Sequence, residues 1–217
     1  MDGNARWAKR EGLSIAEGHK YGAENVKKII TSVADFGITY LTLFALSVEN
    51  WKRSKEEISY LFKLLSIYLK SEESELNKNG IKLKVIGRLD LLNKKLKDVL
   101  DRVIESTKNN NRMTICIAFN YGSIQEITDA CQKIVESGIK LVTTEDFKQY
   151  LYDPQMPDVD LLIRTSGEYR ISNFLLWQSA YAELYFTAKY WPEFNREDLE
   201  GAINDYFQRK RNFGARK

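Results

Sequence analysis

Three polar segments of the sequence combine cationic, hydroxyl and amide side chains in a pattern that suits an anionic ligand. The first, MDGNARWAKR, places Arg6 close to Asp2 and Asn4, and Gly3 permits a close approach of the backbone to a ligand. A helix that begins here would direct free N–H groups at an anion. From these residues alone, the alternative is an ordinary helix start at which Asp2 or Asn4 acts as the N-cap.

The second segment, SVENWKRSKEE, directly follows a strongly apolar run. Its donor-rich side chains are Ser47, Asn50, Trp51 and Arg53. The alternative is a loop that only leads into a helix, with Trp51 packed against the core and Ser54 and Glu57 forming a capping box.

The third segment, RTSGEYRISN, carries Arg164 and Arg170 close to the hydroxyl of Ser172. Arginine guanidinium groups match phosphate oxygens in a bidentate geometry. Each charge-assisted hydrogen bond contributes roughly 1.5 to 3 kcal/mol when it is sheltered from water. The alternative is a surface on which the two arginines pair with Asp160 and Glu168, where each pair contributes little.

Two further residues are candidates for chemistry. Glu183 lies in an otherwise apolar, strand-like run, where a carboxylate is costly unless it is paired or binds a cation. Together with Asp2 it could supply oxygens to Mg²⁺, which typically takes one or two carboxylates and a phosphate group. His19 is the only histidine of the chain. A lone histidine in a helical segment is more often structural than catalytic, but its place one helix away from the first polar segment adds weight to a ligand contact.

The remaining sequence alternates helix-like and strand-like runs that must position these segments. Helical spacing is expected over 23–36, 55–70, 91–107, 123–137, 144–151 and 196–211. Strands are expected over 39–46, 81–87, 113–119, 158–163 and 182–186. This alternation predicts an α/β fold with a central, mostly parallel β-sheet surrounded by helices. In such sheets ligands bind in the loops at the carboxyl ends of the strands.

Composition limits the class of protein. The chain has 217 residues, and we expect a single domain over 1–217 because no linker or repeat interrupts it. With 33 basic and 30 acidic residues, the net charge of +3 is too small to indicate a nucleic-acid partner. Cys116 and Cys131 form no metal-binding or redox spacing, and no signal peptide or membrane-spanning run is present, so we expect a cytoplasmic protein.

Longer motifs carry a resemblance to a known family. DGNARWA, GHKYG, SVENWKRSKEE, FNYG, IRTSGEYRISNFLLWQ, AYAELYF and WPEFNREDLEGAI resemble the signature segments of cis-prenyltransferases, most closely those of bacterial undecaprenyl diphosphate synthases. The similarity runs from residue 2 to about residue 214, in the family's order and spacing.

The resemblance implies an activity. The family condenses isopentenyl diphosphate onto an allylic diphosphate, usually farnesyl diphosphate, with the help of Mg²⁺. A long polyprenyl diphosphate, such as undecaprenyl diphosphate for a cell-wall lipid carrier, is the implied product. The resemblance also implies an apolar tunnel for the growing chain, a homodimer, and a peripheral contact with the membrane for product release.

Residue roles follow from the same resemblance. Asp2 resembles the aspartate that binds Mg²⁺, and Glu183 resembles a second carboxylate that reaches Mg²⁺ across the dimer or through water. The implied allylic diphosphate site comprises Gly3, Asn4, Arg6 and His19, with Trp7 also expected to bind substrate. The implied isopentenyl diphosphate site comprises Arg164, Arg170 and Ser172. A closing loop is implied at Ser47, Asn50, Trp51, Arg53 and Glu57, where Asn50 resembles the residue proposed to help remove the proton.

Some positions depart from the family's pattern. The short apolar strand that usually precedes DGN is not in this sequence, and we expect Asp2 to lack its support. Ile15 and Asn212 stand where arginines are usual, Tyr169 stands where histidine or glutamine is usual, and Ser166 replaces a common glycine. These departures leave a second hypothesis open, an impaired or non-catalytic partner subunit of a cis-prenyltransferase complex. A nucleotide phosphoryl-transfer enzyme is disfavoured because the sequence has no GxxxxGK[ST] loop.

Overall fold

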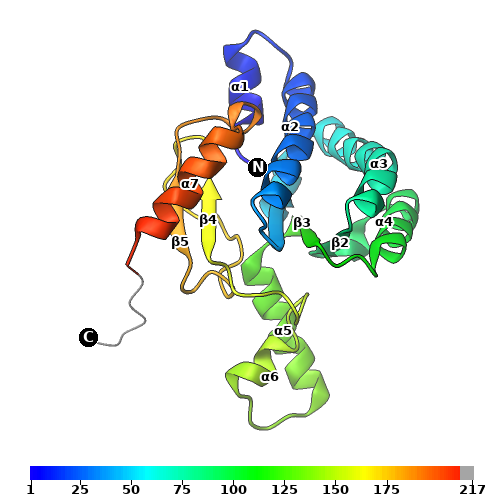
Figure 1. Ribbon diagram of the computed structural model, residues 1–217. Coiled ribbons are helices and arrows are strands. Elements are labelled where there is room, and N and C mark those ends of the chain that lie inside the picture. Colours follow the sequence, from blue (N-terminus) through cyan, green and yellow to red (C-terminus); the bar gives the residue numbers. More distant parts are fainter. Residues whose placement is uncertain (211–217) are drawn as a thin grey trace.

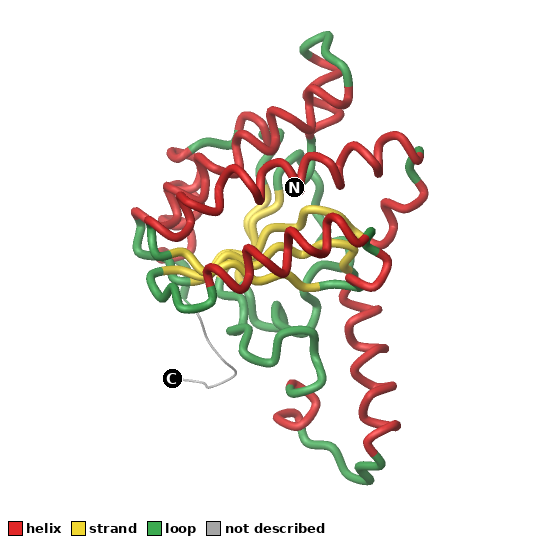
Figure 2. The backbone as a smooth tube through the Cα atoms, turned by 90° about the vertical axis from the view of Figure 1, so that its right-hand side faces the viewer, coloured by secondary structure: helices red, strands yellow, loops and turns green. Residues whose placement is uncertain are grey.

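The computed structural model describes residues 1–210 and has the expected α/β architecture, with parallel strands in the middle and helices around them (Figures 1 and 2). Three strands form one ladder in the order β1-β3-β2: β1 (Tyr40–Ser47), β3 (Met113–Tyr121) and β2 (Ile81–Ile86). Both pairings are parallel. The central strand β3 is almost continuously apolar and buried, as expected for a strand covered on both faces.

Two more strands form a separate parallel ladder, β4 (Leu161–Arg164) and β5 (Glu183–Phe186). Within the described part of the chain, β1 and β4 are not hydrogen-bonded to each other. The first two residues lie between the ladders: the amine of Met1 donates to the Phe44 carbonyl at 2.6 Å, and the Asp2 carbonyl accepts from the Thr165 hydroxyl at 2.7 Å. The start of the chain therefore joins the two groups of strands.

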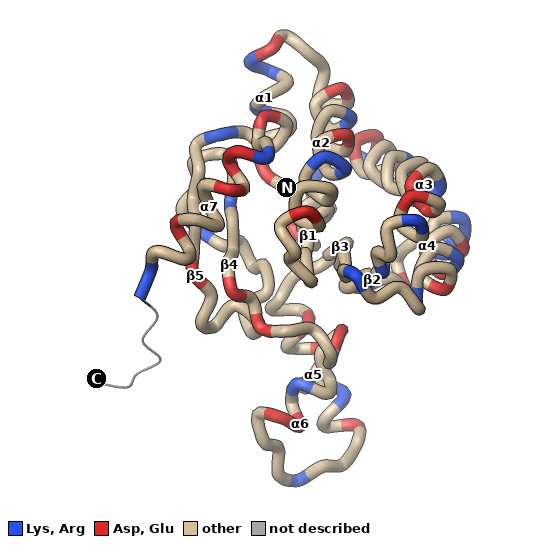
Figure 3. Tube along the Cα trace, in the orientation of Figure 1, with Lys and Arg blue, Asp and Glu red and all other residues tan. Residues whose placement is uncertain are grey.

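Four long helices surround the two groups of strands. They are α2 (Ile15–Asp35), α3 (Lys55–Lys78), α4 (Lys94–Thr107) and α7 (Arg196–Gln208). Each buries an apolar stripe, and α4 shows the pattern most clearly, with Leu96, Val99, Leu100 and Val103 buried. Basic and acidic residues both occur along the outer helices α3 and α4, so neither carries a face of one sign (Figure 3).

The remaining helices are α1 (Asn4–Arg10), α5 (Ser123–Ser137) and α6 (Thr144–Lys148). The α5–α6 segment projects from the body of the molecule (Figures 1 and 2). Its base is fixed by Glu126, which is 1% exposed and accepts hydrogen bonds from the Tyr121 hydroxyl at 2.6 Å and the Tyr152 amide at 3.0 Å. Hydrogen bonding of this kind is what allows a carboxyl group to be buried.

The expected elements are confirmed in type and order, with differences at their ends. Two helices each extend eight residues beyond their expected range at one end. Helix α2 begins at Ile15 rather than residue 23, because Ser14 and Glu17 form a capping box, and α3 continues to Lys78 rather than residue 70. The Ser54 hydroxyl caps α3 by accepting from the Glu57 amide at 3.2 Å. No helix in residues 1–210 is both long enough and apolar enough to cross a membrane.

Candidate active site

A cavity of about 1490 Å³ opens beside the start of the chain and extends along β1, from Ser47 at one end of the strand to Tyr40 at the other. A strand of this length spans roughly 25 Å. One part of the cavity lies between the strands and the helices α2 and α3. Its apolar lining there includes Ile30, Leu43, Leu61, Leu65, Leu69 and Ile115.

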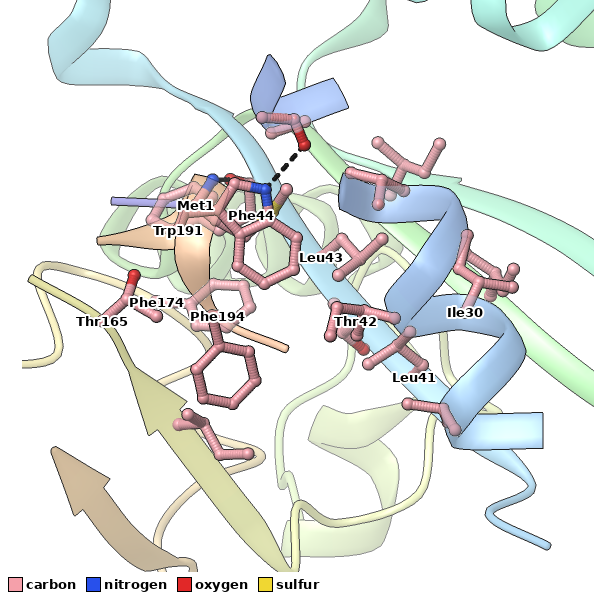
Figure 4. Close-up of a pocket in the computed structure, with 18 of the residues that line it drawn as sticks. Met1, Ile30, Leu41, Thr42, Leu43, Phe44, Thr165, Phe174, Trp191 and Phe194 are labelled. Atoms are coloured by element: carbon pink, nitrogen blue, oxygen red, sulfur yellow. Dashed lines mark hydrogen bonds between the residues drawn. The ribbon is translucent and has the colours of Figure 1, made fainter. Parts of the chain in front are cut away.

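The same cavity also extends between β1 and β4. Phe44 and Phe174 stack there, with ring centroids 4.5 Å apart and an interplanar angle of 11°. Figure 4 shows these rings near Met1, Trp191 and Phe194, with Leu41 and Leu43 of β1 towards α2. Much of the interior of the cavity is therefore apolar. The expected site residues gather at the carboxyl ends of β1 and β4, which we call the polar end, and further charged residues such as Glu72, Glu75 and Arg112 line the cavity elsewhere.

Asp2 lies at the polar end, between two arginines. Its Oδ1 is 3.0 Å from Nη2 of Arg6, and its Oδ2 is 3.1 Å from Nη2 of Arg164. Burial alone would raise the pKa of Asp2, but hydrogen bonds from Arg164 and Arg6 outweigh burial and hold the pKa below its ordinary value. Asp2 is therefore an ionised carboxylate at neutral pH.

Close packing around Gly3 positions this carboxylate. Gly3 has a φ of 110°, and a Cβ atom at this position would lie 2.9 Å from both Ser166 Oγ and Tyr190 Cδ1. Gly3 is the N-cap of α1, and no side chain caps that helix. The alternative in which Asp2 or Asn4 acts only as a helix cap is therefore wrong.

The loop after β4 forms the opposite wall. Nη1 of Arg164 donates to Ser172 Oγ at 2.6 Å and also to the Arg170 carbonyl, so one guanidinium joins Asp2 to this loop. Arg170 itself forms an ion pair with Glu168. The expected alternative, a simple surface pairing of both arginines, holds for Arg170 but not for Arg164, which pairs with Asp2 instead of Asp160.

His19 on α2 is connected to the loop after β1 through Glu57. His19 Nε2 lies 3.1 Å from Glu57 Oε1, which also accepts from Arg53 Nη1 at 3.0 Å. Burial lowers the pKa of His19 and outweighs the opposing effect of Glu57, so the imidazole is neutral near pH 7. The contact places His19 and Arg53 on the same side of the cavity.

The loop from Ser47 to Arg53 is held by side-chain hydrogen bonds. Asn50 Oδ1 accepts from the Ser47 amide at 3.0 Å, and the Trp51 indole donates to Asn120 Oδ1 at 2.6 Å. Trp51 is 41% exposed and packs edge-on against Phe62. It does not fill the core as a buried plug.

Most of the expected site residues line this one cavity. They are Asp2, Gly3, Asn4, Arg6, His19, Ser47, Asn50, Arg53, Arg164, Arg170 and Ser172. Trp7, Trp51 and Glu183 do not line it. Trp7 packs on Tyr21 instead, with ring centroids 4.9 Å apart. Residues from three separate parts of the sequence, 2–19, 47–53 and 164–172, thus converge at one end of the cavity.

Comparison with known proteins identifies the family. Residues 1–214 match the prenyltransferase family model described as "Putative undecaprenyl diphosphate synthase". The chain belongs to the cis-prenyltransferase family. Over 216 residues it is 59% identical to an isoprenyl transferase of Rickettsia sibirica, covering 100% of this chain and 96% of that relative. The isoprenyl transferase of Thermotoga maritima is 48% identical over 219 residues, covering 99% of this chain and 94% of the relative.

A solved structure agrees with this assignment. The crystal structure of lavandulyl diphosphate synthase from Lavandula x intermedia, in complex with dimethylallyl diphosphate, superposes on this prenyltransferase with a TM-score of 0.94. The two sequences are 35% identical, and the match covers 99% of this chain and 95% of the other. The resemblance inferred from the motifs is therefore confirmed at the level of family and fold.

The expected metal ligands of this prenyltransferase do not meet within one chain. In the β4–β5 ladder, Glu183 is paired with Leu161, three positions before the pair of Arg164 and Phe186. This offset separates Glu183 from the Asp2 end of the ladder by roughly 10 Å along the strands. Glu183 instead forms an ion pair with Arg209 at 2.8 Å.

The residues that are present still fit a magnesium ion that also binds a diphosphate. Mg²⁺ needs only one or two protein carboxylates when phosphate oxygens and water complete its octahedron. The ionised Asp2 meets this need at the polar end of the cavity. Within residues 1–210 no group of three or more His, Cys, Asp or Glu side chains is arranged to hold a metal without such help.

Three contributors to the site of this prenyltransferase were not expected. Thr165 holds the Asp2 carbonyl, Asn120 holds Trp51, and Asn173 Nδ2 donates to Glu49 of the loop after β1 at 2.9 Å. All three lie inside the sequence motifs that resemble the family's signature segments. Those motifs could therefore have indicated these residues before the structure was known. Asn212, one of the departures from the family pattern, lies outside the described residues.

Proposed function

We propose that this prenyltransferase condenses isopentenyl diphosphate units onto an allylic diphosphate, with farnesyl diphosphate as the starting substrate. The product is a long polyprenyl diphosphate, in the range of undecaprenyl diphosphate, and it serves as a lipid carrier for the cell wall. The observation that carries this proposal is Asp2 between Arg6 and Arg164 at the polar end of a cavity that runs the length of β1.

The two diphosphates would bind to different walls of the polar end. Arg6, Asn4 and His19 face the allylic diphosphate, and Arg164, Arg170 and Ser172 hold the isopentenyl diphosphate. Ionisation of the allylic substrate separates a carbocation from diphosphate, and fixed guanidinium groups aimed at the developing negative charge lower this barrier. Asp2 would hold Mg²⁺, which when bound neutralises charge on the departing diphosphate.

The loop from Ser47 to Arg53 would exclude water, which could otherwise trap the carbocation. Asn50 is positioned in this loop by the Ser47 amide and assists removal of the proton that completes the new double bond. The apolar part of the cavity then receives the lengthening chain. The lining of the cavity includes Leu76 near the end of α3 and Ile81 at the start of β2, and an apolar space that reaches these residues favours a long product.

The enzyme is proposed to act as a homodimer. Glu183 would then assist Mg²⁺ through a neighbouring subunit or through water, since it lies away from Asp2 in its own chain. Because the product is strongly apolar, its release favours a peripheral contact with a membrane. Sedimentation of the purified protein tests the dimer, and a monomer at working concentration would refute it.

The test of the activity is incubation of the purified protein with farnesyl diphosphate, labelled isopentenyl diphosphate and Mg²⁺, followed by chain-length analysis. Long polyprenyl diphosphates are expected. The absence of any product, together with tight binding to another cis-prenyltransferase chain, would favour the partner-subunit hypothesis instead.

A further inference from the structure

Glu168 connects two arginines that lie far apart in the sequence, Arg6 and Arg170. Its Oε1 lies 2.8 Å from Nη1 of Arg6, and its Oε2 pairs with Nη1 of Arg170. A single carboxylate therefore bridges the guanidinium groups of two arginines that are 164 positions apart in the sequence. In the proposed function, Arg6 belongs to the allylic diphosphate site and Arg170 to the isopentenyl diphosphate site.

The backbone that carries Glu168 is held in place. The Ser166 amide donates to the Lys189 carbonyl at 2.7 Å, and the Gly167 amide donates to the Thr187 carbonyl at 2.8 Å. Both residues have positive φ angles, 86° and 70°, which make the tight turn that directs the next side chain towards α1. The carboxylate therefore extends from a fixed support.

The two arginines need such support because they are open to solvent. The side chain of Arg170 is 61% exposed and that of Arg6 is 43% exposed, whereas that of Glu168 is only 25% exposed. Without a partner, long exposed side chains of this kind sample many rotamers. Hydrogen bonds from Arg170, and then from Arg6, hold the pKa of Glu168 below its ordinary value, so the partner is ionised at neutral pH.

Glu168 acts from outside the cavity. Arg6 and Arg170 both line the cavity, but Glu168 does not, and it contacts only one amino group of each guanidinium. The carboxylate is therefore placed behind the arginines rather than where a diphosphate would bind. Within residues 1–210, Nε and Nη2 of Arg170 make no hydrogen bond to the protein, so they are available to a ligand.

We propose that Glu168 is a positioning residue that fixes Arg6 and Arg170 in a mutual geometry suited to two adjacent diphosphates. This inference rests on the proposed function. Pre-organisation of this kind improves affinity because the ordering of the side chains no longer has to accompany binding.

The test is calorimetric titration of inorganic pyrophosphate, in buffer with a metal chelator, into the full chain and three variants: Glu168→Gln, Arg170→Ala and the double variant. Glu168→Gln should weaken pyrophosphate binding by about five- to tenfold. In the Arg170→Ala background the same change should weaken binding by a clearly smaller factor, because one of the arginines on which Glu168 acts is gone.

Two controls make the result specific. Glu193→Gln removes a carboxylate that pairs with Arg10, another exposed arginine, and it should leave pyrophosphate affinity within about twofold of the parent. Glu168→Ala tests the same loss if the glutamine variant does not fold, as judged by its melting temperature.

Pyrophosphate affinity that is unchanged or higher in Glu168→Gln would overturn the proposal, as would equal effects in both backgrounds. A parent protein that binds no pyrophosphate, either in chelator or in a second titration with Mg²⁺, would instead remove the diphosphate site itself, and with it the proposed function. The two failures are therefore distinguishable without any measurement of turnover.

Discussion

The Asp2 carboxylate lies 3.1 Å from the guanidinium of Arg164, although 162 positions separate the two residues. The proposed chemistry requires this convergence, because Asp2 precedes α1 and Arg164 ends β4. Had the two segments lain on different faces of the molecule, no single diphosphate site could include both. The ion pair also orients the carboxylate before any substrate arrives.

Removal of the Asp2 charge is expected to abolish most activity. Asp2→Asn should lower kcat by about two orders of magnitude or more, since both the proposed metal ligand and the partner of two arginines are lost. Incorporation of labelled isopentenyl diphosphate measures the effect. Asp98→Asn is a suitable control because Asp98 forms a surface pair with Lys94 and does not line the cavity. Near-normal turnover of the Asp2 variant would refute its role.

The two walls of the site should be separable by kinetics. Arg170→Ala should raise the KM for isopentenyl diphosphate by about tenfold or more, because one charge-assisted contact to that substrate is removed. The KM for farnesyl diphosphate should rise much less, and Arg6→Ala should give the reverse pattern. Equal changes in both KM values for each variant would contradict the assignment of the two walls.

A large side chain on α3 should shorten the product. Leu65 lines the cavity, so Leu65→Trp would narrow the apolar part between α2 and α3. Thin-layer chromatography of the dephosphorylated products should show a shift to shorter chains. Ile67 is 51% exposed and does not line the cavity, so Ile67→Trp should leave the product distribution unchanged. Identical distributions for Leu65→Trp and the parent would place the growing chain elsewhere.

Ser166 is a site at which stability can be gained. It has a φ of 86°, and its buried hydroxyl has no hydrogen-bond partner among residues 1–210. Ser166→Gly should therefore stabilise the fold by about 1 kcal/mol and raise the melting temperature. Gly167→Ala is the matched control, since its φ is 70° and there is room for a Cβ; it should lower stability by a similar amount. A lower melting temperature for Ser166→Gly would show that the hydroxyl has a structural role.

His19 should make stability depend on pH. Burial lowers its pKa in the folded state, so as pH falls through the ordinary histidine value of 6.5 the unfolded chain takes up a proton that the folded chain does not. The free energy of unfolding should therefore fall between about pH 7.5 and 5.5. Urea titrations of the parent and His19→Gln should show a smaller fall in the variant, and equal falls would exclude His19 as the cause.

The sequence predicted the strands and their polar ends well, because apolar runs followed directly by charged loops are an unambiguous pattern. It did not predict the first two turns of α2. Gly18 and Gly22 lie there, and glycine disfavours a helix when it is considered alone. In the structure a Cβ on Gly18 would lie 2.4 Å from the Asn4 carbonyl oxygen, and one on Gly22 would lie 2.2 Å from Asn4 Oδ1. These glycines let α1 pack against α2, a tertiary requirement that no local pattern reveals.

The position of Glu183 shows the same limit. Its place in a strand was predicted, and an ion pair was one of the two roles considered for it, without a named partner. The end of the ladder on which it lies depends on the register between β4 and β5. Register follows from pairing across the sheet rather than from the order of residues along one strand. The expectation that Glu183 assists Mg²⁺ therefore stays a prediction.

The backbone amide protons of the two groups of strands should exchange with solvent at different rates. Strand β3 is bonded on both sides, whereas β4 and β5 bond only to each other within the described residues. In deuterated water, amides of β3 should exchange last and those of β4 and β5 sooner, because opening a two-stranded ladder breaks fewer contacts. The ladder that carries Arg164 would then open more readily than the ladder built around β3, so the diphosphate wall formed by the loop after β4 could adjust while the central strand stays in place.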